Sequence, residues 1–263
     1  MCKETSITGE VVKQSKEVLG KAYDDLIHPT AKPVGNMVSF IPRTINVLLG
    51  KWEKWIINGE ESIRLTSEAV REKMAEIPEE NLTEPEPYVA VPAIQQLAYC
   101  YDSEELREMY ANLLVASMNT ETKYQVHPSF VDIIKQLTPD EAKLLKHISK
   151  RIGQGNFPVI NVVINTSKTS HITIVKHFSD IGYGVCDVPE NIAAYLENLS
   201  RLGIIEIPSG SYIVNDAIYH PLENHEVIKA IMEKPLQGDR TYKIERELFY
   251  ITMFGHNFIA TCI

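Results

Sequence analysis

LTPDEAKLLKHISKRIGQGNFPVINVVIN, residues 137–165, is the stretch in which the chain changes from helical to β-type sequence. Thr138 as N-cap, Pro139 at the first helical position and Glu141 three residues after the cap predict the start of a helix. After Gly153 the residues are β-branched and bounded by Gly and Asn, which predicts a strand. The stretch therefore predicts a helical part of the chain followed by a mixed α/β part.

The sequence before this stretch is mainly helical in pattern. Residues 1–30 contain a polar, weakly amphipathic helix, and residues 31–137 contain several helical runs. Within the second segment, IPEENLTEPEPYVAVP at residues 77–92 carries four prolines and predicts an extended tether, with the next helix opening at Val91–Pro92. We therefore expect a polar helix, a helical domain with a Pro-rich tether, and a further domain over residues 138–263.

The C-terminal domain resembles a winged helix in its order of elements. A helix over about residues 188–202 ends at Gly203 and is followed by a Ser-Gly-Ser hairpin. We expect an α-rich α+β fold, with a helical N-terminal portion and a winged-helix-like α/β C-terminal domain. Winged helices bind DNA with basic side chains, but here Arg201 stands against Glu197 and Glu206, so the charge disfavours DNA.

The composition points to a soluble protein of a reducing compartment. The net charge of -9 and the pI near 5.4 argue against broad attraction to nucleic acid or anionic membranes. The four cysteines have neither metal-knuckle spacing nor the density of a secreted disulfide scaffold. No apolar run approaches the ~18 residues of a spanning helix. We expect a cytoplasmic protein, with peripheral contact at the inner face of the membrane left open.

The sequence contains no convincing catalytic or metal-binding constellation. GQG at residues 153–155 follows a helix and precedes a strand, the reverse of a phosphate-binding glycine loop. The histidine pairs lack a third metal ligand, and Cys100 with His127 would form a nucleophilic pair only if the fold brought them together. We predict no catalytic residue, metal or cofactor. The histidines considered are His171 with His177 and His220 with His225.

VGNMVSFIPRTINVLLGKWEKWI, residues 34–56, is the one apolar stretch with inverted charge. It is amphipathic at helical spacing and contains both tryptophans, and four basic residues and one acidic residue lie between Lys32 and Lys54. Such a helix suits a membrane interface, a protein partner or an ordinary core, and the sequence leaves these open. The predicted face consists of Phe40, Ile41, Ile45, Leu48, Leu49, Trp52, Trp55 and Ile56, with Arg43, Lys51 and Lys54 beside it.

Five motifs follow one another in a characteristic order along the chain. They are VGNMVSFIPRTIN, the block IPEENLTEPEPYVAVPAIQQLAYCYDSEELREMYANLLVASMN, HPSFVDIIKQLTPDEAKLLKHI, YLENLSRLGIIEI and ITMFGHNFIATCI. This order resembles the Abi-alpha family, bacterial proteins associated with abortive infection, a defence against bacteriophage. The resemblance runs from Val34 to Ile263 and is most specific in the central block. It implies a biological context and carries no catalytic motif.

The resulting hypothesis is a non-enzymatic bacterial defence protein that acts through protein or membrane interaction. The C-terminal domain would bind a protein, and the helix at 34–56 would be held until infection releases it. Two alternatives remain: a winged-helix transcriptional regulator, and a hydrolase or nuclease whose residues converge only in three dimensions. The identity of the protein partner and the oligomeric state are not predicted.

Overall fold

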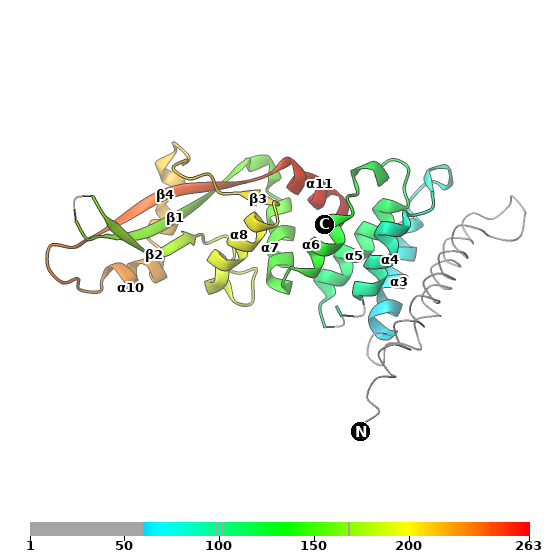
Figure 1. Cartoon of the computed structure of the whole chain (residues 1–263), viewed down its shortest axis with the longest axis horizontal. Coiled ribbons are helices and arrows are strands. Elements are labelled where there is room, and N and C mark those ends of the chain that lie inside the picture. The colour runs from blue at the N-terminus through cyan, green and yellow to red at the C-terminus, as the bar shows by residue number, and fades with distance from the viewer. Residues whose placement is uncertain (1–59, 98, 101, 168) are drawn as a thin grey trace, which may run out of the picture. The chain divides into compact units, whose positions relative to one another are not determined.

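The computed structural model describes residues 60–97, 99–100, 102–167 and 169–263 (Figure 1). It divides into two compact units. The first ends at Lys135 and takes in Cys262, and the second comprises Gln136–Thr261 with Ile263. The helical part followed by an α/β part, as expected from the sequence, is confirmed.

The first unit is a group of helices around α5. Helix α5 packs against α3, α4 and α6, and its Tyr110, Ala111 and Leu113 are fully buried. The hydroxyl of Tyr110 donates a hydrogen bond to the carbonyl of Val131, so the only polar atom of this side chain is satisfied inside the core. The elements are α3 Glu60–Met74, η1 Glu79–Asn81, α4 Pro87–Leu97, α5 Glu104–Ser117, η2 Lys123–Gln125 and α6 Ser129–Lys135.

Helix α4 begins at Pro87, earlier than the start predicted at Val91–Pro92. Proline is well suited to the first position of a helix, where no backbone N–H is needed. Pro92 then lies inside the helix and removes one backbone hydrogen bond. Burial of the apolar face of α4 offsets the loss of that hydrogen bond. The proline content alone predicts an extended segment and carries no information on this burial. The buried residues are Val89, Ala90, Ala93, Ile94 and Leu97.

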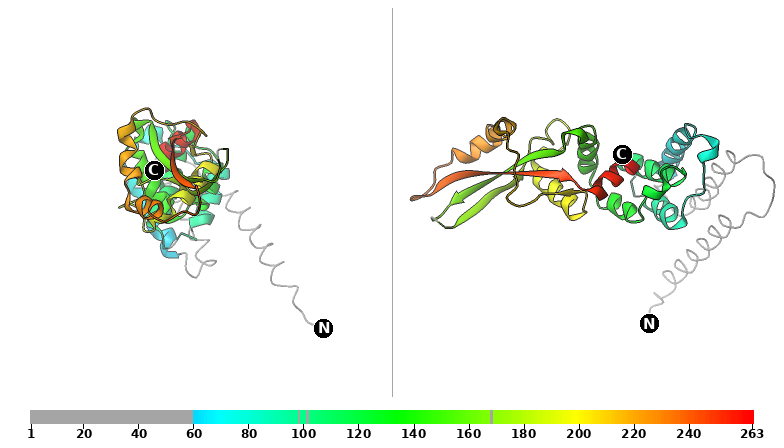
Figure 2. Two further views of the ribbon diagram at one scale, coloured as in Figure 1. Left: turned by 90° about the vertical axis from the view of Figure 1, so that its left-hand side faces the viewer. Right: turned by 90° about the horizontal axis from the view of Figure 1, so that it is seen from above.

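The second unit is a four-stranded antiparallel sheet with helices around it (Figure 2). The strand order is β2-β1-β4-β3. The strands are β1 Asn156–Asn165, β2 His171–Phe178, β3 Ile205–Glu206 and β4 Thr241–Ile251. The helices are α7 Pro139–Ser149, η3 Ile152–Gln154, η4 Pro189–Asn191, α8 Ile192–Arg201, η5 Asp216–Ile218, α9 His220–Glu223, α10 Glu226–Met232 and α11 Met253–Cys262.

The predicted start of α7 is confirmed in detail. The backbone N–H of Thr138 donates to Glu141 Oε2 at 2.7 Å, and the N–H of Glu141 donates to Thr138 Oγ1 at 3.2 Å. This reciprocal pair is a capping box, with Pro139 in the first turn. The strand predicted after Gly153 is β1.

Strand β1 is the centre of the second unit and is covered on both faces. Val159, Ile160, Val162 and Val163 are fully buried although their side chains alternate between faces. On the paired strand β4, two neighbouring residues contact different elements. Arg246 bonds Glu223 of α9, whereas Glu247 Oε2 lies 3.6 Å from His177 Nε2 on β2.

The winged-helix expectation is not confirmed. The residues after β3 form a turn and coil in place of the predicted hairpin, and β3 pairs with the end of β4, Ile205 opposite Ile251. Pro208 has no N–H for a strand ladder, and Gly210 takes a φ of 73° that turns the chain. Val214 accordingly remains 87% exposed. The long hairpin of this unit is β1–β2, which precedes α8.

Candidate functional site

The binding face predicted at residues 34–56 lies outside the described residues, and it stays a prediction. This applies to Phe40, Ile41, Arg43, Ile45, Leu48, Leu49, Lys51, Trp52, Lys54, Trp55 and Ile56. Among the helices that the structure does describe, none combines the length and the apolar character needed to cross a bilayer. A functional site is therefore sought in residues 60–263.

The cysteine considered as a nucleophile is a buried structural residue. Cys100 Sγ donates to the carbonyl of Gln96 at 3.5 Å, and burial raises the pKa of the Cys100 thiol to about 11. His127 makes its own contacts, with Nδ1 2.6 Å from Ser129 Oγ and its ring against Phe130. A buried thiol with a high pKa is a poor nucleophile, so this pair does not define a site.

The histidine pairs do not assemble a metal site in the described part of the chain, where no cluster of three or more His, Cys, Asp or Glu side chains suits a metal ion. His220 opens α9, and the Nδ1 of His225 accepts from the Val227 N–H at 3.3 Å as the N-cap of α10. His171 is exposed at one end of β2. His177, at the other end, is different and is described below.

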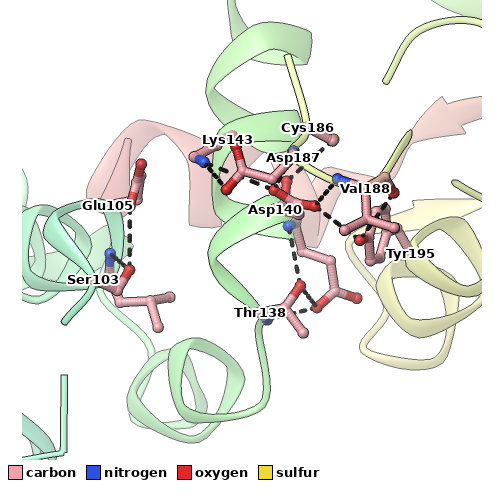
Figure 3. Close-up of polar contacts among 11 residues, drawn as sticks. Ser103, Glu105, Thr138, Asp140, Lys143, Cys186, Asp187, Val188 and Tyr195 are labelled. Atoms are coloured by element: carbon pink, nitrogen blue, oxygen red, sulfur yellow. Dashed lines mark hydrogen bonds and ion pairs between the residues drawn. The ribbon is translucent and has the colours of Figure 1, made fainter. Parts of the chain in front are cut away.

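Asp140 is the centre of the densest polar network in the second unit (Figure 3). Its Oδ1 accepts from the Asp187 N–H at 2.8 Å, and its Oδ2 accepts from the Val188 N–H and the Tyr195 hydroxyl, both at 2.9 Å. Lys143 Nζ lies 3.8 Å from Asp140 and 2.8 Å from Asp187. The carboxylate thereby joins the first turn of α7 to the loop at 187–188 and to α8.

The electrostatics identify Asp140 as a structural residue. Burial alone would raise the pKa of its carboxyl, but the two backbone hydrogen bonds, the Tyr195 hydroxyl and Lys143 outweigh it, and the pKa is lowered. The carboxylate is thus charged and already engaged by three donors. A group with its acceptors so occupied holds the fold together and is not available to a ligand.

His177 occupies a strained position near the end of β2. The pairing of β2 with β1 shifts register twice, between Ile160 and Val162 and again between Val162 and Val163. His177 has a φ of 53°, in the left-handed region, where it is the one non-glycine residue among those described. Its N–H donates to the buried Asn161 Oδ1 at 2.8 Å, which holds the backbone in this bulged conformation.

The side chain of His177 lies between two carboxylates. Its Nε2 is 3.6 Å from Glu247 Oε2 on β4, and its Nδ1 is 3.7 Å from Glu197 Oε1 on α8. Both distances are too long for a hydrogen bond. Glu197 is instead bound by Lys176 Nζ at 2.9 Å. We call His177, Glu197 and Glu247 the His177 centre.

The His177 centre is buried and incompletely satisfied. The imidazole is 12% exposed, and both His177 Nδ1 and Glu247 Oε2 are buried atoms without a hydrogen-bond partner in the described structure. Burial lowers the pKa of His177, Lys176 adds to that effect, and Glu247 and Glu197 oppose it; the net direction is downward. Unpaired buried polar atoms on a strained backbone cost stability, which makes this the strongest candidate for a functional feature.

A second candidate is the outer edge of the sheet at Ile172–Ile174, which we call the β2 edge. Strand β1 is the only described strand paired with β2. The side chains of Ile172 and Ile174 are 55% and 41% exposed. The pairing of His171, Ile172 and Thr173 with β1 is regular, so the irregular half of β2 lies beyond them. This places two large apolar side chains on a strand edge.

The basic residue of the predicted recognition helix is engaged within the second unit. Arg201 on α8 donates to Gln136 Oε1 from two nitrogens, each at 3.1 Å, and to Asn198 Oδ1 at 2.6 Å from Nη2. These contacts join α8 to the segment before α7. Arg201 therefore has a structural role within the second unit, and the acidic residues around it also disfavour DNA binding.

No sequence signal identifies the His177 centre. The sequence relates His177 only to His171, as a pair of metal ligands, because strict alternation puts residues six apart on one strand face. The two register shifts in β2 break that alternation. Glu247 lies 70 residues further along the chain, in β4, so no local pattern relates it to His177.

The comparison with protein families assigns the chain to a family, which the fold alone does not do. A helical unit is followed by an antiparallel α/β unit, and the described residues contain no cluster of three or more side chains suited to a metal ion. The abortive infection alpha model matches residues 59–262, which is most of the chain. The protein belongs to the abortive infection alpha (Abi-alpha) family. No match was found among curated proteins or among solved structures.

Proposed function

We propose that this protein is a bacterial anti-phage defence protein that acts by binding another protein and not by catalysis. Family membership supports the abortive-infection role. The observation that carries the binding mechanism is the β2 edge, with Ile172 and Ile174 exposed on the outermost strand. The partner in this proposal is a protein that contributes an extended segment to the sheet.

Strand addition follows from what the β2 edge offers. An edge strand presents unpaired backbone N–H and C=O groups, and only another extended backbone complements them along its length. The opposite edge, β3, has only two residues and offers little to pair with. The regular half of β2 is His171–Thr173 and contains Ile172, whereas Ile174 lies at the first register shift, between Thr173 and Val175. The added strand would therefore pair beside His171–Thr173 and end near Ile174.

The chemistry of the partner segment follows from the sequence around this edge. Residues 166–178 contain Lys168 and Lys176 and no acidic residue, in a chain with a net charge of -9. Lys176 is bound by Glu197 of α8. A complementary segment would carry apolar side chains to cover Ile172 and Ile174, with acidic residues beside them. Such complementarity contributes to partner choice and orientation more than to affinity.

The test is protection of phage-infected cells by variants of the β2 edge. Replacing Ile172 and Ile174 together by lysine should abolish protection, because charged side chains prevent apolar packing and discourage strand addition. Val214→Lys is the matched control, since Val214 is an exposed apolar residue remote from β2 in sequence. Each protein is checked for native circular dichroism. Retained protection by the folded double variant would reject the β2 edge as the effector surface.

A further inference from the structure

We propose that His177 is a proton-operated switch that controls the local structure of β2. The neutral imidazole lies between the carboxylates of Glu197 and Glu247, in a position that we call the seat, and stabilises the bulge. The protonated imidazole leaves the seat, so the end of β2 loosens when the pH falls. The switch stands on its own geometry; only its consequence for the β2 edge rests on the proposed function.

The backbone at His177 is under strain that a change of conformation can release. A φ of 53° is uncommon for residues other than glycine, although histidine tolerates it better than most. The conformation persists because Asn161 accepts the His177 N–H and because the bulge places the ring under α8 and β4. Strained, bulged positions are enriched at switch regions, where the strain makes two conformations close in energy.

The surroundings of the ring satisfy neither the neutral nor the protonated imidazole fully, so gain of a proton can change which conformation of His177 is favoured. The charged groups that face the ring are Glu197 from α8, Glu247 from β4, and Lys176 from β2 itself. A neutral ring leaves Nδ1 and Glu247 Oε2 without hydrogen bonds. A protonated ring would need both carboxylates to move closer, while Glu197 is already bound at 2.9 Å by Lys176.

The direction of the response follows from burial. A histidine whose pKa is lowered in the fold binds its proton more weakly there than in an unfolded or open form. The closed seat is therefore fully favoured above the ordinary pKa of about 6.5 and loses population relative to the open form below it. Acidification selects the conformations in which the His177 ring reaches water.

The open form has a defined structural consequence. When the ring leaves its position between the carboxylates, the bulge keeps only the hydrogen bond from the His177 N–H to Asn161 Oδ1, and residues Val175–Phe178 can then change register against β1. A shift of one residue reverses which side chains face the core. The β2 edge lies immediately before this segment, so the switch would alter the surface that the proposed partner uses.

The decisive experiment is amide hydrogen exchange of the full chain at pH 7.5 and pH 5.0, corrected for intrinsic exchange. Protection of β2 should fall at pH 5.0 by up to about 30-fold, the limit for an open form with pKa near 6.5 and a closed form that binds no proton. His177→Asn tolerates a positive φ and cannot titrate in this range, so its β2 protection should be independent of pH. His171→Asn, on the same strand, should behave like the parent.

The charges around the ring supply a second, independent readout. In histidine NMR titrations, Glu247→Gln should lower the pKa of His177 further, because it removes a carboxylate that favours the proton. Lys176→Met should raise the pKa, because it removes a cation and frees Glu197. Shifts of opposite sign support the switch, whereas shifts of the same sign, or none, overturn it.

Two outcomes would refute the proposal directly. One is equal β2 protection at both pH values in the parent, and the other is an unchanged pH dependence in His177→Asn. Both measurements use purified protein without phage. If the protection assay rejects strand addition at the β2 edge, the exchange result for His177 still stands. If the exchange of β2 does not depend on pH, the result of the protection assay still stands.

Discussion

Replacing Asp140 by asparagine is the sharpest test of how the second unit is held together. The carboxylate accepts two backbone N–H groups and the Tyr195 hydroxyl, and asparagine has only one oxygen to accept them. Its amide N–H₂ would face at least one donor, which leaves a buried donor unpaired. Since hydrogen bonds to a charged group contribute about 1.5–3 kcal/mol each, we expect a loss of roughly 3 kcal/mol in unfolding free energy.

Asp187→Asn is the matched control for this substitution. Asp187 also binds Lys143, at 2.8 Å, but its side chain is 76% exposed. An exposed ion pair contributes about 0–1 kcal/mol, so this variant should be close to the parent. The two carboxylates therefore share a lysine and differ in burial, which isolates the effect of the buried hydrogen bonds.

The assay is urea unfolding at pH 7, followed by circular dichroism and by the amide signals of Asp187 and Val188. A pKa lowered in the fold means that Asp140 contributes stability above the ordinary carboxyl pKa of about 3.9 and loses it as the pH falls through the folded value. The difference between parent and Asp140→Asn should therefore shrink in acid. A cost no larger than that of Asp187→Asn at pH 7 would refute the structural role.

Two further predictions test packing in the second unit and the predicted binding helix. Gly255→Ala should prevent native packing of α11, because a Cβ there would lie 2.0 Å from the Ile204 carbonyl oxygen, whereas Gly153→Ala, with open space around it, should be nearly neutral in thermal unfolding. If residues 34–56 bind membranes, flotation with anionic liposomes should be lost in folded Trp52→Glu and Trp55→Glu variants; flotation equal to the parent's would rule out the tryptophans as the membrane contact.

The elements that sequence predicts well here are those fixed by local signals. The start of α7 follows from Thr138, Pro139 and Glu141, and the end of α8 follows from Gly203, which adopts a φ of 76°. Each signal lies within a few residues of the structure that it specifies. Strand β1 likewise follows from the β-branched residues after Gly153.

The features that sequence did not predict depend on contacts between distant segments. The pairing of Ile205 with Ile251 replaces the expected wing hairpin, and nothing within residues 203–215 indicates that β3 will take its partner from β4. The early start of α4 at Pro87 depends on burial of its apolar face against other helices. The His177 centre combines three elements, α8, β2 and β4, and a register irregularity that hydropathy cannot encode.

Helix α8 connects the two polar networks, and this limits what the proposed switch can move. Tyr195 binds Asp140 on one side of α8, and Glu197 faces His177 and Lys176 on another. Release of His177 removes only the second contact, so α8 should stay attached to α7 while β2 changes.

The two titrations also occur in separate ranges of pH. His177 responds below about pH 6.5, whereas the lowered pKa of Asp140 keeps its carboxylate charged at least down to the ordinary carboxyl pKa of about 3.9. Between these two values Asp140 keeps its contacts while those of His177 change. Exchange at pH 5.0 should consequently affect β2 and leave the Asp187 and Val188 amides protected. If those two amides lose protection together with β2, acid opens the whole unit, and the confined movement inferred for His177 is wrong.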